Sequence, residues 1–175
     1  MKLFKNTVYL FTLATIILSC GGGEPNGVGM NTWPGYEDLK FHIGTQDPIN
    51  TVMEFDSADR SKDYDKMRSM TTDSSEFIGG DGVVKNVEEY FDSLKERDAR
   101  MDSLKATWSW KTTAIFSVDI APGEGGELVH NYWDGIYTEG DSENNVRGME
   151  MWYVVNGKVM KVTTYFQDIP EEDEE

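Results

Sequence analysis

Apolar residues recur at helical spacing in the first half of the chain. Pro48 suits the first position of a helix, and Asp47 suits its cap. The apolar stripe of this predicted helix consists of Ile49, Val52 and Met53. A second, shorter helix is predicted to begin near Ser61, and it places Tyr64 and Met67 together.

The clearest helical pattern lies in residues 84–101, after a short strand predicted at 75–80 that glycines terminate. Apolar residues are spaced there at i, i+3, i+4 and i+7, with charged residues between them. These apolar residues are Val87, Tyr90, Phe91 and Leu94. A face of this kind is buried against another element, so a third helix packed on a core is expected.

The second half of the chain alternates between apolar and polar residues, which predicts long strands. Residues 104–120 form the first of them, and residues 128–140 the second. One face of the first strand is predicted to carry Leu104, Ala106, Trp108, Trp110, Ala114, Phe116, Val118 and Ile120. The dipeptide Asn156-Gly157 is a strong hairpin signal, and it joins a third strand to a fourth at 158–168.

Helices followed by a meander of strands predict an α+β domain with helices on one side of a curved antiparallel sheet. Roughly 130 residues are available for it, enough for one compact core and too few for two. The domain is expected at residues 45–168. Residues 20–44 precede it as a tether and irregular lead-in, and residues 169–175 follow it as an acidic tail. Residues 141–145 are predicted to turn into the third strand.

Residues 1–19 have the layout of a secretory signal, because two lysines precede an apolar run too short to span a bilayer. Cys20, the only cysteine, follows "IILS", and this segment resembles the lipobox of bacterial lipoproteins. The resemblance implies a lipid on Cys20 and a protein held at a membrane of the bacterial cell envelope. Gly21 favours the outer membrane, by analogy with lipoprotein sorting. An ordinary signal peptide or a short N-terminal anchor is the alternative.

The chain is strongly acidic, which bears on its partners. Its net charge is -16, and it becomes -18 without Lys2 and Lys5, since residues 1–19 contain no acid. Such a surface repels phosphate backbones and anionic headgroups, so nucleic acid is not expected as a partner. The sequence contains no phosphate-binding glycine loop and no metal-ligand pattern, so neither a cofactor nor a metal is predicted.

The order of these elements and the stretch "RGMEMWYVVNGKVMKVTTYFQD" resemble the SnoaL-like group of the nuclear transport factor 2-like superfamily. The resemblance covers roughly residues 47–168, and it implies a cone-shaped sheet with three N-terminal helices on its concave side. This superfamily includes isomerases, cyclases, hydrolases, dehydratases and members without chemistry, so the resemblance concerns fold more than activity.

The resemblance assigns chemistry to one residue. SnoaL-type cyclases have an acid/base aspartate two positions before the aromatic residue of the hairpin, and Glu150 stands there, before Trp152. Their pocket histidine falls near Tyr137 in this chain. The general base of the isomerases falls on a glycine of "EFIGGDG", so the isomerase machinery is absent. The candidate catalytic residues are therefore Glu150, with His130 or Tyr137 assisting.

A two-residue turn at Asn156-Gly157 also predicts which residues share the face of Glu150. Counting outward from the turn pairs Trp152 with Lys161, Glu150 with Thr163 and Gly148 with Tyr165. The other face collects Met149, Met151, Tyr153, Met160, Val162 and Phe166. Hydrophobicity alone makes this methionine-rich face the core, whereas the resemblance makes the Glu150 face line the cavity and the methionine-rich face cover a second subunit.

Three functions remain open on this evidence. The first is a lipid-anchored domain whose cavity binds a small, largely apolar molecule. The residues predicted to bind it are Trp108, Trp110, Trp133, Trp152 and Tyr165. The second is an isomerase or cyclase type of enzyme with Glu150 as acid/base, favoured if burial raises the pKa of this residue. The third is a structural or adaptor role as a homodimer. A lone histidine such as His130 is also commonly structural.

Overall fold

The computed structural model describes residues 27–32, 34–37 and 39–170. The predicted signal at 1–19, the lipidation site at Cys20 and the last five residues of the acidic tail lie outside these residues. The lead-in contributes one short strand, β1 (His42–Ile43), which pairs with the first long strand.

Within the described residues three helices form in the expected order, and local signals fix where they begin. They are α2 (Gln46–Arg60), α3 (Tyr64–Ser69) and α4 (Val87–Leu104). The α3 helix begins three residues after Ser61, because the side chain of Asp63 caps it by accepting a hydrogen bond from the backbone N–H of Lys66. The α4 helix begins with a capping box, in which Asn86 and Glu89 each accept a hydrogen bond from the other's backbone N–H.

Four long strands and three short ones form a single seven-stranded sheet. Besides β1, the strands are β2 (Thr71–Ile78), β3 (Val84–Lys85), β4 (Thr107–Asp119), β5 (Gly126–Glu139), β6 (Ser142–Val155) and β7 (Lys158–Asp168). Their order is β1-β4-β5-β6-β7-β2-β3, and every neighbouring pair is antiparallel except β2 and β7. The segment predicted as a turn at 141–145 is mostly strand, since β6 begins at Ser142.

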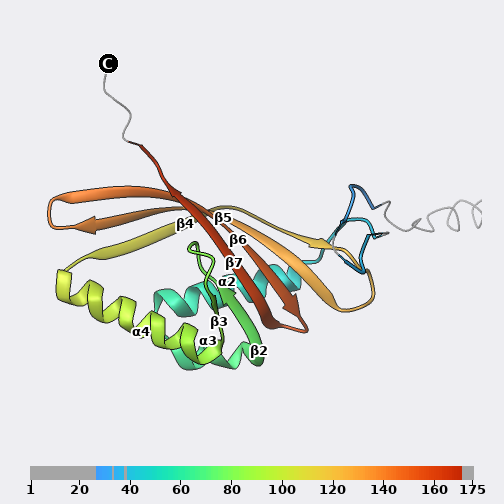
Figure 1. The fold of residues 1–175 in the computed structure, drawn as a ribbon, viewed down its shortest axis with the longest axis horizontal. Coiled ribbons are helices and arrows are strands. Elements are labelled where there is room, and N and C mark those ends of the chain that lie inside the picture. The colour runs from blue at the N-terminus through green and yellow to red at the C-terminus, as the bar shows by residue number, and fades with distance from the viewer. Residues whose placement is uncertain (1–26, 33, 38, 171–175) are drawn as a thin grey trace, which may run out of the picture.

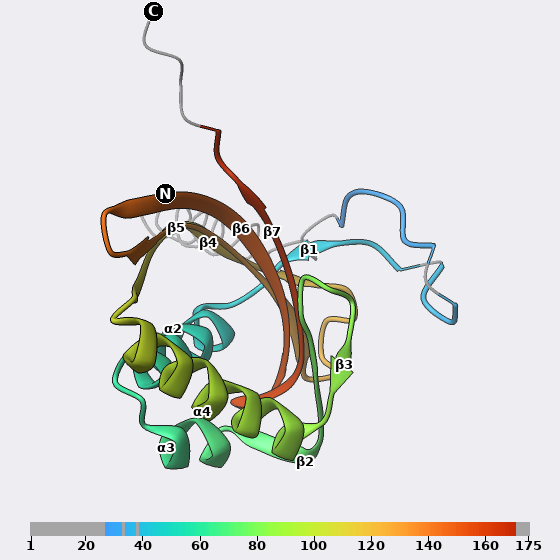
Figure 2. The same cartoon turned by 60° about the vertical axis from the view of Figure 1, so that its left-hand side comes forward.

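The sheet is strongly curved, and all three helices lie within its concave side (Figure 1). Figure 2 shows the long strands bending around the helices, with the β2–β3 hairpin closing one side. This arrangement confirms the predicted α+β fold with helices on the concave face.

The core fills the space between the helices and the concave side of the sheet. The α2 helix contributes Phe55, whose ring meets the rings of Phe77 on β2 and Trp152 on β6. The ring of Tyr90 on α4 stacks on Phe77, with centroids 3.7 Å apart. The buried cluster also includes Val52, Met67, Phe91, Leu94, Val129, Val154, Val159 and Val162. The methionine-rich face of β6 is therefore not the core.

Candidate active site

The strand β6 directs Glu150 toward the helices. Alternate residues of a strand share a face, and the buried residues Gly148, Trp152 and Val154 lie on the same face as Glu150. Across the ladder, Glu150 is opposite Asn131 on β5 and Thr164 on β7. The prediction that the Glu150 face lines the interior of the fold is confirmed.

The predicted pairing of β6 with β7 is wrong beyond Val154. Val154 faces Val159 as expected, but Tyr153 faces Lys161, so Met160 is an extra residue that bulges out of the ladder. The shift of one residue moves every later side chain of β7 to the opposite face. Val162 therefore joins the core, while Lys161 leaves the face of Glu150.

Tyr165 is affected by the same bulge. It pairs with Met149 on the outer face, and 52% of its surface is exposed. Its predicted position beside Glu150 is therefore wrong.

A second bulge corrects the predicted face of β4. Thr112 pairs with Trp133 and Ala114 pairs with Tyr132, so Thr113 is the extra residue. Trp108 and Trp110 point inward, whereas Phe116 lies on the outer face and is 44% exposed. The residues predicted to share one face of the strand at 104–120 therefore lie on two faces, inward before the bulge and outward after it.

The inward residues enclose a pocket of about 200 Å³ between α2, α4 and the long strands, named here the concave pocket. Its helical wall consists of Phe55, Asp56, Asp59, Tyr90, Leu94 and Arg97. Its sheet wall consists of Trp108, Trp110, Trp133, Glu150 and Trp152. Four of the five residues predicted to bind a ligand therefore meet at this one pocket.

The tryptophans of the sheet wall fit where neighbouring strands carry glycine. Trp133 lies opposite Gly148, and a Cβ added at this glycine would stand 2.1 Å from the ring. Trp108 covers Gly135 in the same way, at 2.3 Å. Trp108 also meets the edge of Trp133, with ring centroids 5.7 Å apart. Because these glycines have no side chain, they leave space for the two tryptophan rings to pack.

Burial raises the pKa of Glu150 from its ordinary value to about 7. Hydrogen bonds from Asn131 Nδ2 and Trp152 Nε1 oppose this shift, at 3.3 and 3.1 Å from Oε2. The nearby charges of Asp56 and Asp59 add to it. Glu150 therefore exchanges a proton near neutral pH, as a general acid or base requires.

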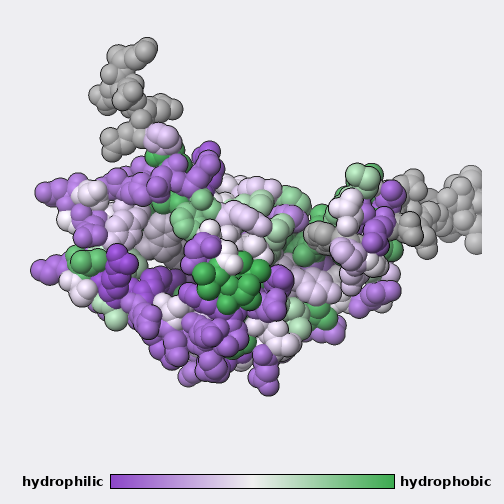
Figure 3. Space-filling model, in the orientation of Figure 1, coloured by the Kyte–Doolittle hydropathy of each residue, from purple (hydrophilic) through white to green (hydrophobic). Residues whose placement is uncertain are grey.

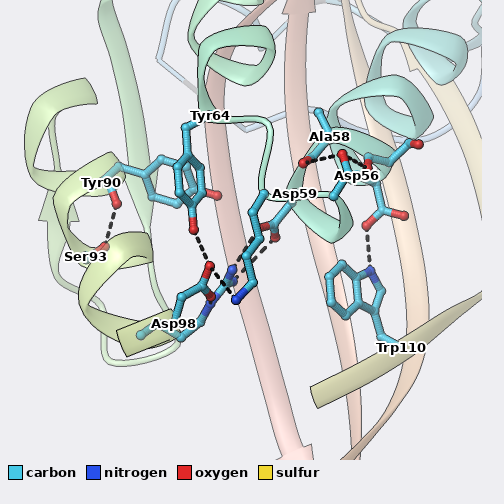
Figure 4. Close-up of polar contacts among 12 residues, drawn as sticks. Asp56, Ala58, Asp59, Tyr64, Tyr90, Ser93, Asp98 and Trp110 are labelled. Atoms are coloured by element: carbon cyan, nitrogen blue, oxygen red, sulfur yellow. Dashed lines mark hydrogen bonds and ion pairs between the residues drawn. The ribbon is translucent and has the colours of Figure 1, made fainter. Parts of the chain in front are cut away.

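The other charged residues of the concave pocket, Asp56, Asp59 and Arg97, each have an ionic partner. Figure 4 shows the hydrogen bond from Trp110 to Asp56 and the network that joins Asp59 and Asp98. Asp56 accepts a hydrogen bond from Trp110 Nε1 at 2.5 Å and pairs with Arg60 at 2.8 Å. Arg97 bridges Asp59, at 2.8 Å, and Asp98, at 3.1 Å.

This network continues away from the concave pocket through Asp98. Tyr64 donates a hydrogen bond to Asp98. Burial is the largest cause that raises the pKa of Tyr64, this hydrogen bond is the next, and the pKa reaches about 12. Burial of Asp98 opposes its ionisation, but the hydrogen bonds from Tyr64 and Arg97 hold the pKa of this acid below its usual range.

His130 lies on the other side of the sheet from Glu150. It stacks on Phe116 at 5.1 Å between ring centroids, and burial lowers its pKa. Adjacent residues of a strand point to opposite faces, so Asn131 faces Glu150 and His130 does not. The structure therefore does not bring His130 to the site.

Tyr137 is on the inner face but beyond the concave pocket. It pairs with Trp108 near the end of β5, and its hydroxyl donates a hydrogen bond to Glu139 at 2.6 Å. It is therefore not in contact with Glu150.

Sequence reasoning missed the helical side of the site. Tyr90, Leu94 and Arg97 are spaced by four and three residues, so they share one face of α4, and this spacing was available as a signal. Asp56 and Asp59 are likewise three residues apart on α2. Asn131 had no comparable signal, because its contact with Glu150 depends on the pairing of β5 with β6.

A second hollow lies on the outer face of the sheet. It measures about 380 Å³ and is lined by Leu128, Met151, Tyr153 and Thr163, among others. It is larger than the concave pocket but holds neither Glu150 nor any of the tryptophans. The concave pocket is the better candidate because it is enclosed by helices and sheet, and because a carboxyl of raised pKa stands in it.

The described part of the chain brings together no group of three or more acidic, histidine or cysteine side chains suited to a metal ion. No helix within the same part has both the length and the apolar character needed to cross a membrane.

Comparisons with known proteins identify the fold. No family model matches this chain, and no curated protein matches it. Among solved structures, the β subunit of the benzoate 1,2-dioxygenase from Burkholderia mallei has a TM-score of 0.57 at 12% identity, over 72% of this chain and 92% of the other.

Two more solved structures are similar. An LEH-like epoxide hydrolase from M. tuberculosis has a TM-score of 0.54 at 17% identity, over 70% and 84% of the two chains. An NTF2-like protein from Burkholderia xenovorans has a TM-score of 0.50 at 14% identity, over 72% of this chain and 93% of the other. Helices within a curved sheet, an acid on the inner face of its third long strand and these neighbours together identify a nuclear transport factor 2-like α+β fold.

Proposed function

We propose that this domain binds a small molecule in the concave pocket, with an apolar or aromatic body against the tryptophans and one polar group at Glu150. The observation that carries the proposal is the arrangement of the wall: Trp108, Trp110, Trp133 and Trp152 line the same pocket as the carboxyl group of Glu150. Pockets that bind small molecules combine such apolar walls with a few placed polar groups. The volume of about 200 Å³ suits a fragment-sized ligand.

The test uses the full-length protein in a non-ionic detergent and a library of small aromatic fragments. Native mass spectrometry detects bound fragments, and tryptophan fluorescence measures their affinity. Trp108→Leu should weaken the hits several-fold, because its ring forms part of the wall. Phe116→Leu is the matched control, since it lies in the same strand on the outer face. Equal affinities in the two variants would place the binding site elsewhere.

A second candidate function is proton transfer, of an isomerase or cyclase type. It is favoured by the pKa of about 7 at Glu150 and by Tyr90, which lines the same pocket. Burial raises the pKa of Tyr90, so its hydroxyl stays protonated and able to donate a hydrogen bond to a substrate oxygen. Glu150→Gln should abolish turnover of any substrate found. Retained turnover would exclude Glu150 as the acid/base.

We further propose that the domain is lipid-anchored through Cys20 in the bacterial cell envelope, at the outer membrane. The lipobox-like sequence before Cys20 supports this proposal. Metabolic labelling with a fatty acid, followed by fractionation of membranes, tests it. Cys20→Ser should lose both the label and the membrane association. A labelled Cys20→Ser protein would contradict the proposed attachment site.

A further inference from the structure

We propose that the ligand of the concave pocket is a small organic cation, an amine or guanidinium on an apolar or aromatic body, whose charged group pairs with Glu150. This inference rests on the proposed binding function and specifies the chemical class of the ligand.

Glu150 is the one carboxylate of the described pocket lining that has no cation of its own. Asp56 pairs with Arg60, and Asp59 pairs with Arg97, both at 2.8 Å. Among the described residues, Glu150 receives hydrogen bonds only from the neutral groups of Asn131 and Trp152. A carboxylate shielded from water without a cation is costly, and a bound cation offsets part of that cost.

The polar atoms beside Glu150 that have no hydrogen-bond partner among the described residues are acceptors. Both donors to Glu150 use Oε2, so Oε1 has no hydrogen-bond partner among the described residues. Beside it, Asn131 is 1% exposed, and its Oδ1 is buried without a partner in the described part of the chain. An ammonium group carries three donors and no acceptor, which complements such a corner, whereas a second carboxylate does not.

The aromatic wall is also suited to a cation. The guanidinium of Arg60 already lies over the ring of Trp110, with its carbon 4.6 Å from the ring centroid. Trp108, Trp133 and Trp152 carry further rings on the same wall. Cations are attracted to the faces of tryptophan rings, most strongly where water is excluded.

The charges around Glu150 favour a cation over an anion. Asp56 and Asp59 face it from α2, and Arg97 on α4 is already shared between two carboxylates. Tyr90 on α4 and Asn131 on β5 are neutral. The net charge of -16 attracts cations to the whole molecule.

One positively charged side chain, that of Lys85, lines a different pocket near Glu150. Lys85 on β3 lines a smaller pocket of about 110 Å³ that also reaches Glu150. No ion pair between Lys85 and Glu150 occurs within the described residues. The burial that raises the pKa of Glu150 is consistent with the lack of such a pair.

The test compares three probes that share a phenethyl body and differ in charge. They are 2-phenylethylamine, 2-phenylethanol and 3-phenylpropionate, titrated into the full-length protein in a non-ionic detergent near pH 8. The amine should bind at least about tenfold more tightly than the alcohol, and the carboxylate more weakly than either. Among the three probes, added salt should weaken the binding of the amine selectively.

Glu150→Gln should reduce the affinity for the amine to about that for the alcohol. Glu143→Gln is the matched control, because Glu143 is an exposed glutamate of the same strand. The affinity of the natural protein for the amine should also rise between about pH 5.5 and pH 8 as Glu150 ionises, and this rise should be absent from Glu150→Gln.

The results separate this inference from the proposed function. If the alcohol binds as tightly as the amine, or if Glu150→Gln binds the amine normally, the cation inference is overturned while small-molecule binding stands. If the anion binds best, the inference is overturned in the same way. If neither these probes nor any library fragment binds, both proposals fail.

Discussion

The carboxyl group of Glu150 is subject to opposing influences. Removal from water disfavours its charged form, while Asn131 and Trp152 donate hydrogen bonds that favour it. The loss of hydration is the larger effect, so the pKa settles near 7. The group is therefore poised between its charged and neutral forms under physiological conditions.

This balance predicts how the stability of the protein depends on pH. The native carboxyl keeps its proton up to about pH 7, whereas the unfolded chain releases it near the ordinary value of 4.5. The native state thus binds more protons between these values, and the free energy of unfolding falls as pH rises through them. The loss attributable to Glu150 is on the order of 3 kcal/mol.

Glu150→Gln should remove this contribution. Between about pH 5 and pH 8 the variant should lose less stability than the natural protein, by up to about 3 kcal/mol, as measured by urea denaturation at each pH. Glu143→Gln, on an exposed position of the same strand, should follow the natural protein. Parallel curves for Glu150→Gln and the natural protein would mean that the carboxyl titrates normally.

The place of Glu150 on the inner face could be predicted, but its surroundings could not. The likeness of its hairpin to a known fold placed it correctly, whereas hydrophobicity alone placed the methionines of β6 inside. Met149 and Met151 are partly buried on the outer face instead. Its partner Asn131 depends on the pairing of two strands, which one sequence does not specify.

At the scale of the strands, two extra residues decide which side chains reach the pocket. The predicted alternation of inward and outward residues is correct along β4 up to Thr112 and along β7 up to Val159. Thr113 and Met160 then reverse the faces. Threonine and methionine are not signals for a bulge. The order of the four long strands and the hairpin at Asn156-Gly157 were therefore predictable from the sequence, while the start of β6 and the faces of Phe116 and Tyr165 were not.

The contact between neighbouring strands at Gly148 makes a second prediction. Gly148→Ala places a methyl group within 2.1 Å of the present position of the Trp133 ring, so the ring must move. We expect a loss of about 1–3 kcal/mol in the free energy of unfolding, and a changed near-ultraviolet circular dichroism from the displaced tryptophan. Asn145→Ala, at an exposed position of β6, is the control. An unchanged spectrum for Gly148→Ala would contradict the packing described.

At the scale of the whole molecule, the two sides of the sheet differ. The inner side is covered by helices, while the outer side carries aromatic residues that are partly exposed: Phe116, Tyr132, Tyr153 and Tyr165. In the view of Figure 3 hydrophilic residues dominate the surface, and an apolar patch lies over the β2–β3 hairpin, where Val83 and Val84 are exposed. Exposed aromatic residues gathered on one side of a sheet favour association.

We propose that the outer side of the sheet pairs with a second copy of the chain. Light scattering should then give the mass of a homodimer at micromolar concentration, and Phe116→Lys should shift it toward the monomer by placing a charge on that face. Glu96→Lys, on an exposed position of α4, should leave the dimer intact. A monomer for the natural protein would contradict the proposal.

The parallel pairing of β2 with β7 has a consequence for the order in which the chain acquires its structure. The strand β2 follows the first two helices, and apart from the two-residue strand β3 its partner among the described residues is β7, the last strand of the domain. Val159 and Val162, which complete the core beneath those helices, also come from that last strand. Contacts so distant in sequence form late and slowly. The first half of a growing chain therefore has no finished core of its own until Lys158–Asp168 has emerged.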